Sequence, residues 1–413
     1  RISSRAICAL LVLGTLLASA VAFSEPQVAV GGDFLDVHLV AGTHDDVGWL
    51  LTPEEYYEQQ VRHILDTTIV ALQNAPWRKF MYVEIYYFQR WWSDPRTTPQ
   101  QQALLRQLLA NGQWEFIMGG WVMPDEATTT YSANMDQLTE GHLFLNRTFG
   151  ITPNIGWQID PFGASTALAT NYKMAGFKYH IIDRINYRVH DKLVKEQAME
   201  FFWKPSLSRP AESIFTHILD MNYCFPMNAG FDFEGDASSN PPVTNDNIQT
   251  RAYEYARQVR QRAPIWRTKH MLMLHQCDFK YQKAALQFDN MDKIINYIME
   301  NPQTFNMSLK WSKLSTYFSV LETLPASTWP SRGAEDFFPY DDNAESWWTG
   351  YYTSRPELKG LVRQAEAELR IADNLASFVA VHDKSMSGLP SAVDELHQAL
   401  AIAQHHDAVA GTE

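Results

Sequence analysis

Ionisable side chains stand at or just after the C-terminal ends of three predicted strands. In parallel α/β folds these strand ends form the catalytic face, so we expect the three groups to share one site. Imidazole and carboxyl groups in that position can bind a metal ion or carry out acid–base and nucleophilic chemistry. The residues are His44, Asp45 and Asp46 in the first group, Asp160 in the second and Asp278 in the third.

The first group has the residue types of a zinc site. His44 and Asp46 are two positions apart, and Gly48 permits a tight turn that would aim both side chains at one ion. Zn²⁺ binds imidazole nitrogen and carboxylate oxygen at about 2.0–2.2 Å. A loop histidine with solvated acidic neighbours is the alternative interpretation of this pair taken alone.

A fourth cluster, His405-His406-Asp407, follows an apolar helical pattern. Continuing the inward stripe of that helix by three or four residues reaches His406 and Asp407 and leaves His405 on a different face. Two surface histidines on a polar helix are the alternative for this cluster taken alone. In combination with the other groups, the cluster completes a zinc shell of two histidines and two aspartates. The ligands expected in this shell are His44, Asp46, Asp160 and His406.

Several tryptophans lie close to these motifs in the sequence. A tryptophan ring offers a flat apolar surface with a polar edge, which suits the apolar face of a sugar ring. Most of these rings are expected in the core, so a ligand-binding role is assigned only to Trp49 and Trp348.

The elements that must position the site alternate between short apolar runs and helical patterns. This alternation is typical of βαβ units with a parallel sheet, either open or closed into a barrel. A polar segment over 226–250 is predicted to be a long surface loop. Strands are predicted over 37–40, 80–85, 114–118, 154–159 and, as the last of the series, 270–274, and helices over 53–73 and 100–110.

The composition changes after about residue 330, where an aromatic stretch leads into a region that is helical without strands. Helices are predicted there over 357–381 and 392–403. We therefore predict a catalytic α/β domain over 36–330 and the start of an α-helical domain over 331–413. Residue 1 is Arg and the last residues follow directly on a helical pattern, so we expect the sequence to be part of a longer chain.

The charge balance argues against one class of partner. The 413 residues include 34 basic and 47 acidic side chains, which give a formal net charge of −13 without a dense basic run. Phosphate backbones bind clustered Lys and Arg, so nucleic acid is not expected as a partner. Hydrophobic residues make up 46%, which is enough for a large core and outside the range of disordered chains.

The first residues have the features of a secretory signal peptide over 1–22. A basic start is followed by an apolar run and by small residues at 18, 20 and 22. An uncleaved anchor over 6–23 is the alternative, since this run is barely long enough to span a bilayer. If the signal is cleaved, no stable membrane insertion is expected.

Sequons and cysteines also bear on the compartment. The sequons at Asn146 and Asn306 fit an exported glycoprotein. Cys224 and Cys277 are the cysteines of the mature part, and they either form a disulfide in an oxidising compartment or remain two separate buried thiols.

Six segments in a fixed order give the sequence a family resemblance. They are 43–49 (THDDVGW), 119–126 (GGWVMPDE), 156–163 (GWQIDPFG), 336–340 (DFFPY), 348–356 (WTGYYTSRP) and 405–412 (HHDAVAGT). Together these segments resemble the glycoside hydrolase family 38 α-mannosidases, and the lysosomal type more closely than the Golgi type. The resemblance extends over about residues 36–413.

The resemblance implies a β/α-barrel-like parallel-sheet domain followed by the start of an α-helical bundle. It also implies zinc-dependent, retaining hydrolysis of terminal α-mannosides of N-glycans and other oligosaccharides, in the lysosome or vacuole or after secretion. A retaining glycosidase uses two carboxyl groups about 5–5.5 Å apart. By resemblance, zinc is bound by His44, Asp46, Asp160 and His406, Asp160 is the nucleophile, Asp278 is the general acid/base, and Arg184 and Asp407 bind substrate.

The chain departs from the family pattern at three places. Ala164 replaces a usual His, His275-Gln276-Cys277 replace small residues before the acid/base, and Thr130 stands near a common His. These changes could alter the acid/base properties of Asp278, whereas all four expected zinc ligands are present. A zinc-dependent deacetylase or amidohydrolase and an inactive mannoside-binding relative are the alternative functions. Because the family continues beyond its HHD segment, we expect weak or no activity from these 413 residues alone.

Overall fold

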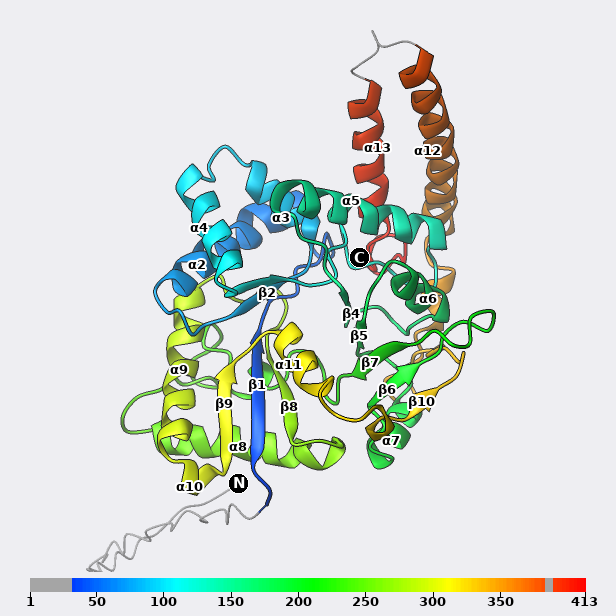
Figure 1. The fold of residues 1–413 in the computed structure, drawn as a ribbon. Helices are drawn as coiled ribbons and strands as arrows, with labels where there is room; N and C mark the ends of the chain where they lie inside the picture. Colours follow the sequence, from blue (N-terminus) through cyan, green and yellow to red (C-terminus); the bar gives the residue numbers. More distant parts are fainter. Residues whose placement is uncertain (1–31, 383–388) are drawn as a thin grey trace, which may run out of the picture. The chain divides into compact units, whose positions relative to one another are not determined.

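Three parallel strands with β1 at their centre lead into the predicted site (Figure 1). The computed structural model describes residues 32–382 and 389–413, and residues 33–413 form one compact unit. The predicted signal peptide at 1–22 lies outside the described residues. Within the described ranges, every helix is too short or too polar to cross a bilayer.

The described strands form three sheets. The first is parallel and has the order β8–β1–β9, and the second has the order β10–β6–β7–β5–β4 with an antiparallel β6–β7 pair and parallel pairs elsewhere. The third is the parallel pair β2–β3. The predicted α/β class with parallel strands is confirmed. The strands are β1 (Leu35–Ala41), β2 (Phe80–Tyr82), β3 (Trp114–Phe116), β4 (Ile155–Gln158), β5 (Tyr179–Ile182), β6 (Glu200–Trp203), β7 (Ile214–Ile218), β8 (His270–His275), β9 (Met307–Trp311) and β10 (Ser331–Arg332).

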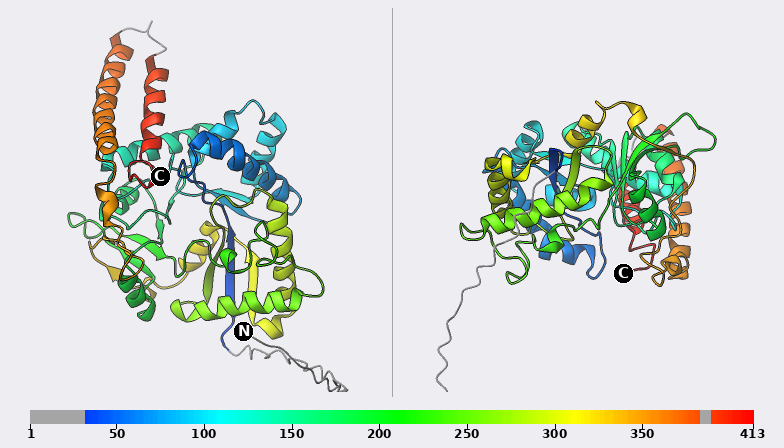
Figure 2. Two further views of the ribbon diagram at one scale, coloured as in Figure 1. Left: turned by 180° about the vertical axis from the view of Figure 1, so that it is seen from behind. Right: turned by 90° about the horizontal axis from the view of Figure 1, so that it is seen from below.

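Helices cover the sheets and connect their strands (Figures 1 and 2). α9 packs against β9, α2 and α8, and α12 packs against α13. The α-helices are α1 (Pro53–Tyr56), α2 (Arg62–Gln73), α3 (Ile85–Ser93), α4 (Pro99–Ala110), α5 (Tyr131–Phe149), α6 (Thr166–Met174), α7 (Tyr187–Lys195), α8 (Ile248–Arg262), α9 (Ala284–Glu300), α10 (Pro302–Phe305), α11 (Leu314–Leu321), α12 (Pro356–His382) and α13 (Leu389–Ala403). A π-helical turn, η1 (Tyr57–Val61), joins α1 to α2, and 3₁₀ turns are η2 (Met227–Ala229), η3 (Ala263–Ile265), η4 (Ala326–Thr328) and η5 (Thr349–Tyr352).

Two predicted strands differ from the structure. The run predicted over 80–85 ends as a strand at Tyr82, because Ile85 already begins α3, whose apolar face is buried. The strand at 270–274 is not the last of the series, since β9 follows and pairs with the other edge of β1. β9 alternates buried and more exposed side chains, so it lacks the continuous apolar run by which its neighbours β1 and β8 are predicted.

The segment 226–250 is not a surface loop throughout. Apart from the 3₁₀ turn η2, its chain is irregular up to the start of α8, but Phe231, Phe233 and Val243 are buried in the main core. These apolar side chains stand singly among polar residues, which hides them from a pattern based on runs.

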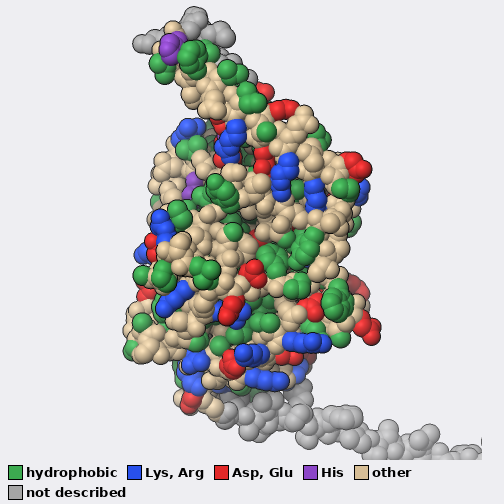
Figure 3. Space-filling model, turned by 90° about the vertical axis from the view of Figure 1, so that its right-hand side faces the viewer, with side chains coloured by type: hydrophobic (Ala, Val, Ile, Leu, Met, Phe, Trp, Pro, Cys, Tyr) green, Lys and Arg blue, Asp and Glu red, His purple; other side chains and the backbone are tan. Residues whose placement is uncertain are grey.

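Hydrophobic side chains are exposed along α12 (Figure 3). Their fractional exposures lie between 59% and 75%, and three of them follow the spacing i, i+4, i+7 of one helical face. An apolar stripe of this kind is typical of a surface that packs against another element. The residues are Leu361, Ile371, Leu375, Phe378 and Val381.

The segment that precedes α5 is positioned by a very close backbone contact. A Cβ atom at Gly141 of α5 would lie 2.0 Å from the carbonyl oxygen of Gly119. At this contact the Trp121 amide donates to the Gln137 carbonyl oxygen at 3.1 Å. Gly141 therefore allows α5 to pack directly on the turn at residues 119–120.

We predict that Gly141→Ala destabilises the protein by about 2–4 kcal/mol, because the methyl group would overlap backbone that cannot move freely. Gly360→Ala is the matched control, since a Cβ at this exposed position of α12 meets no atom within 4 Å. The control should gain up to about 1 kcal/mol from helix propensity. Urea unfolding of both variants measures the two changes, and equal midpoints would contradict the close contact.

Candidate metal centre and active site

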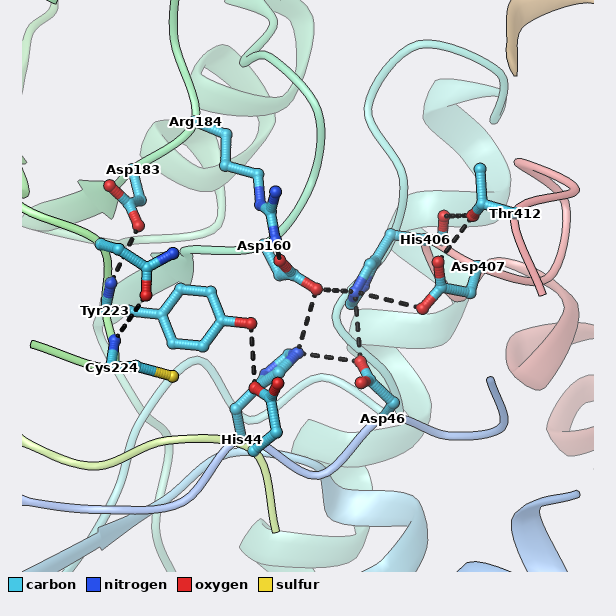
Figure 4. Close-up of polar contacts among 12 residues, drawn as sticks. His44, Asp46, Asp160, Asp183, Arg184, Tyr223, Cys224, His406, Asp407 and Thr412 are labelled. Atoms are coloured by element: carbon cyan, nitrogen blue, oxygen red, sulfur yellow. Dashed lines mark hydrogen bonds and ion pairs between the residues drawn. The ribbon is translucent and has the colours of Figure 1, made fainter. Parts of the chain in front are cut away.

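The structure brings together the four residues that the sequence predicts as zinc ligands (Figure 4). All four side chains are buried. His44 Nε2 lies 2.8 Å from Asp46 Oδ1 and 3.3 Å from Asp160 Oδ2. His406 Nε2 lies 3.2 Å from Asp46 Oδ1 and 2.9 Å from Asp160 Oδ2. Two imidazole nitrogens and two carboxylate oxygens therefore face one small volume.

The turn after β1 positions the first two residues of this cluster. The His44 carbonyl accepts a hydrogen bond from the Phe279 amide at 2.9 Å, and an isolated bridge pairs His44 with Asp278 after β8. Beyond it, the Gly48 amide donates to the Asp46 carbonyl at 2.8 Å with φ +89°. A side chain other than that of glycine is strained at this φ, so the sequence signal for a tight turn was informative.

Asp45, which lies between His44 and Asp46 in the sequence, is hydrogen-bonded outside the cluster. Its carboxylate accepts hydrogen bonds from Thr43 Oγ1 at 2.7 Å and from Tyr82 Oη at 3.0 Å. Burial raises the pKa of Asp45 well above its ordinary value. Asp45 thus stabilises the turn that carries His44 and Asp46 and is not one of the cluster residues.

His406 reaches the cluster from a turn, and the helical extrapolation that selected it is wrong. α13 ends at Ala403, and the chain then folds against the 119–126 segment, where the Asp125 amide donates to the Gln404 carbonyl at 3.0 Å. His406 Nδ1 lies 2.9 Å from the Met123 carbonyl oxygen and donates to it. This hydrogen bond fixes the ring so that Nε2 faces the carboxylates, the arrangement common for metal-bound histidine.

His405 does not lie on a different face, contrary to the prediction. It is buried, and its Nε2 atom is 3.5 Å from Asp407 Oδ2 and 3.7 Å from Asp46 Oδ1. Both histidines can turn inward because residues 404–411 form a turn, in which the side-chain directions of an α-helix no longer apply. His405 is therefore a member of the site that the sequence pattern missed.

The cluster fits a metal ion such as Zn²⁺. Both ring nitrogens of His44 and Oδ1 of Asp46 make no hydrogen bond of good geometry with any described residue. The nitrogen–oxygen separations of 2.8–3.3 Å are close to the edge of about 3.3 Å expected for tetrahedral ligands at zinc bond lengths. Behind the cluster, Glu84 Oε1 is 3.6 Å from His44 Nδ1, and both residues are buried.

The charges in the cluster are strongly coupled. Burial alone would raise the pKa values of Asp46 and Asp160, but His44 and Arg184 respectively hold them below the ordinary range. Burial would likewise lower the pKa of His406, but Asp160 and Asp407 raise it well above its ordinary value. The carboxylates thus favour positive charge between them, which protons or a metal cation can supply.

The residues predicted to bind substrate lie beside the cluster. The Arg184 guanidinium donates to Asp160 Oδ1 and lies 5.7 Å from the centre of the Trp348 ring. Asp407 accepts a hydrogen bond from Thr412 Oγ1 at 2.6 Å. Trp49, three residues after Asp46, is 38% exposed.

Trp348 is held more firmly than Trp49. Its ring stacks on Phe162 at 4.4 Å, and its Nε1 atom donates to Asp342 Oδ2 at 3.1 Å. A pocket of about 290 Å³ is lined by Arg184, by Tyr187 and Tyr340, and by Asp342, the residue that accepts the Trp348 hydrogen bond.

Asp278 is hydrogen-bonded to Tyr223, a residue that no sequence motif marks. Tyr223 Oη donates to Asp278 Oδ1 at 2.9 Å, and the Tyr223 ring meets the His44 ring edge-on at 5.3 Å. Burial, the largest influence, raises the pKa of Asp278 above its ordinary value even though His44 and Tyr223 oppose it. Asp278 therefore has the environment of a carboxyl group that can carry a proton.

A disulfide joins Cys224 to Cys277, so the first of the two alternatives for these cysteines is the correct one. Cys224 follows Tyr223 directly, and Cys277 directly precedes Asp278. The covalent bond therefore ties the loop after β7 to the loop after β8 at the point where the tyrosine hydroxyl meets the carboxyl group. Sequence could not choose between the alternatives because pairing depends on loops 53 positions apart.

Glu126 is a buried carboxyl group for which the sequence predicted no role. Its Oε2 atom accepts from the Ser165 amide at 2.6 Å, and Oε1 accepts from Gln158 Nε2 at 3.0 Å. These bonds connect the 119–126 segment to the loop that carries Asp160. Burial raises the pKa of Glu126 to about 7.

Comparisons with known proteins identify relatives of the whole region. The family model "Glycosyl hydrolases family 38 N-terminal domain" matches residues 34–343, and "Alpha mannosidase middle domain" matches residues 346–413. The chain is 40% identical over 403 residues to a lysosomal alpha-mannosidase of Dictyostelium discoideum, covering 94% of this chain and 39% of that protein. It is 36% identical to the human epididymis-specific alpha-mannosidase, covering 96% of this chain and 42% of the relative.

A solved structure has the same fold. An alpha-mannosidase from Enterococcus faecalis V583 superposes with a TM-score of 0.68 at 17% identity, over 91% of this chain and 39% of that one. The chain thus spans about 40% of the length of the curated relatives that it matches.

We predict that the raised pKa of Glu126 makes the protein less stable as the pH rises. Below pH 4.5 the group is protonated in both the folded and the unfolded state, whereas between pH 4.5 and about 7 the unfolded state releases the proton first. The loss of unfolding free energy should reach roughly 3 kcal/mol above pH 7. Glu126→Gln should remove this slope in thermal unfolding measured from pH 4.5 to 8, while the exposed Glu357→Gln keeps it. Parallel slopes in both variants would refute the assignment.

We predict that the double variant Cys224→Ser/Cys277→Ser lowers both stability and catalytic efficiency in the full-length protein. Loss of the cross-link should cost roughly 2–4 kcal/mol. Freed loops should misplace the tyrosine and the carboxyl group and reduce kcat/KM by about 10-fold or more. The metal content should stay unchanged, because none of the four cluster residues is altered. Wild-type stability and kcat/KM in the double variant would contradict a positioning role for the disulfide.

Proposed function

The chain belongs to glycosyl hydrolase family 38, and from this premise we propose that the protein is a zinc-dependent, retaining α-mannosidase. Its proposed substrates are the terminal α-mannosides of N-glycans and other oligosaccharides. The observation that carries the proposal is the double environment of Asp160, which belongs to the buried cluster that could hold a metal ion and is also paired with Arg184. Relatives that match this region are named alpha-mannosidases.

Asp160 is the proposed nucleophile. Its pairing with Arg184 and with two histidines outweighs burial and keeps the pKa of the carboxyl low, so the group is ionised. An ionised carboxylate can attack the anomeric carbon of the sugar and form a glycosyl-enzyme. Arg184 also stabilises the negative charge again when water later releases the sugar from Asp160.

Asp278 is the proposed general acid and base. Burial raises its pKa, which favours the protonated form needed to donate a proton to the leaving oxygen. The same carboxylate then accepts a proton from the water that hydrolyses the intermediate. Tyr223 Oη fixes one carboxyl oxygen, so the other remains available for the transfer. A retaining mechanism requires about 5–5.5 Å between the two carboxyl groups.

Zinc would be held by the four cluster residues His44, Asp46, Asp160 and His406. When bound, the ion supplies a positive charge that orients sugar hydroxyl groups and favours a distorted ring. Arg184 and Asp407 are proposed to hydrogen-bond the substrate, and the exposed Trp49 ring to pack on an apolar sugar face. The pocket beside Arg184 gives room for a further sugar unit.

The surroundings support a role in the secretory pathway, with the lysosome as the proposed site. Asn146 of the first sequon is exposed at the end of α5, where a glycan can be attached. Relatives from Dictyostelium discoideum, Cavia porcellus and Mus musculus are named lysosomal alpha-mannosidases. We also propose that the parallel sheets belong to a barrel-like catalytic domain, and that α12, with its exposed apolar stripe, begins a helical bundle.

Substitution of the two aspartates tests the mechanism in the full-length protein. Asp160→Asn should reduce hydrolysis of an aryl α-mannoside by about 10³-fold or more, because no glycosyl-enzyme can form. Asp278→Asn should keep a burst of aryl release and be rescued by azide, which needs no base and would yield an α-mannosyl azide. The exposed Asp191→Asn is the matched control and should retain full activity.

Metal removal and product analysis separate the alternatives. A chelator should abolish activity, and Zn²⁺ should restore it. Undiminished turnover by Asp160→Asn would overturn the proposed nucleophile, and release of acetate from an acetylated sugar by that variant would indicate a deacetylase. Tight binding of mannosides by the wild-type protein without turnover would indicate an inactive relative.

A further inference from the structure

A second cluster of histidine and aspartate lies at the opposite end of the three-stranded sheet from the candidate active site. Asp36 and His38 stand two positions apart near the start of β1 and share one face of the sheet. The parallel register places Asp36 beside His270, the first residue of β8. These strand starts lie near the bottom of Figure 1, away from the ends that carry His44 and Asp278.

The three side chains converge on one small volume. Asp36 Oδ2 lies 3.5 Å from His38 Nε2 and 3.3 Å from His270 Nδ1, and one ligand atom from each residue lies within 4.8 Å of the others. Tetrahedral ligands at zinc bond lengths are separated by about 3.3 Å, so the two measured distances suit neighbouring ligands of one ion.

His38 presents an unpartnered nitrogen to this volume. Ser312 Oγ donates to the Lys313 carbonyl oxygen at 3.3 Å, so it accepts from His38 Nδ1 at 2.9 Å. That leaves the lone pair on Nε2, and this atom makes no hydrogen bond with a described residue although the ring is completely buried. An imidazole nitrogen facing a carboxylate oxygen without a proton between them is unfavourable unless a cation binds both.

A protonated His38 that donates to Asp36 is the alternative to a metal ion, and measurements of zinc content distinguish the two.

The other oxygen of Asp36 is already occupied by protein donors. Ser308 Oγ donates to Asp36 Oδ1, and Lys310 Nζ lies 3.3 Å from the same atom. Both residues come from β9, so the carboxylate is oriented with Oδ2 toward the histidines. His270 Nδ1, like His38 Nε2, has no hydrogen-bond partner of good geometry among the described residues.

We propose that Asp36, His38 and His270 form a second metal site that binds a divalent transition-metal cation of the zinc class. Asp36 and His270 are partly exposed, with side-chain exposures of 24% and 28%, so water can complete the coordination shell. The ion would join β1 to β8 at their amino ends. Its role is structural, because the active-site residues are supplied by the carboxyl ends of the same strands.

The experiment measures zinc content and cobalt spectra in the full-length protein. After equilibration with buffered Zn²⁺, the wild type should hold one more equivalent than His270→Gln, as measured by elemental analysis. His406→Gln should lose the active-site ion and keep the second one. Co²⁺ added to His406→Gln should give the d–d absorption of a histidine-bound ion, and the double variant His406→Gln/His270→Gln should lose it.

Stability gives a separate measurement. Excess Zn²⁺ should raise the unfolding midpoint of His406→Gln but not of the double variant, and His270→Gln should weaken zinc binding at this site at least 10-fold.

Mannosidase activity should persist in His270→Gln, and the exposed His63→Gln is the control for loss of any histidine. Asp36→Asn replaces His270→Gln if that variant does not fold. Equal zinc content in wild type and in the soluble variant, or no zinc in His406→Gln, would overturn the proposal.

Discussion

The burial of four ionisable side chains in one cluster constrains the structure around it. Removing a charge from water costs several kcal/mol unless an opposite charge or hydrogen bonds replace the water. Asp160 is therefore paired with Arg184 as well as with the histidines, and His406 is fixed by the Met123 carbonyl. Loss of one partner leaves an uncompensated charge, so each of these contacts supports the others.

The surrounding chain is shaped to deliver these side chains from distant positions. His44 after β1 and Asp160 after β4 come within 3.3 Å of each other. The turn at Gly48 redirects the chain after Asp46, and the disulfide holds the loops after β7 and β8 together. Parallel strands suit this task because their carboxyl ends lie on one face. Asp160 and Asp278 can thus differ in protonation, since Asp160 faces Arg184 and Asp278 faces Tyr223.

The sequence was most informative where chemistry depends on short spacing. The pair His44 and Asp46, with Gly48 behind it, predicted a tight turn that the structure contains. His406 was predicted from a helical pattern that ends at Ala403, so a residue that does join the cluster came from a wrong geometry. Tyr223, Glu126 and the cluster around His38 depend on contacts between residues far apart in the chain, and β9 lacks an apolar run. No local pattern records such contacts, which is why only the structure revealed them.

The turn at residues 404–411 has a consequence for how the protein can vary. His406 in this turn comes from the part of the chain that matches the middle-domain model. The other three cluster residues come from the part that matches the N-terminal model. The cluster is therefore formed jointly by the two matched parts of the chain, residues 34–343 and 346–413. A change in the placement of one part relative to the other would therefore separate His406 from the other three residues of the cluster.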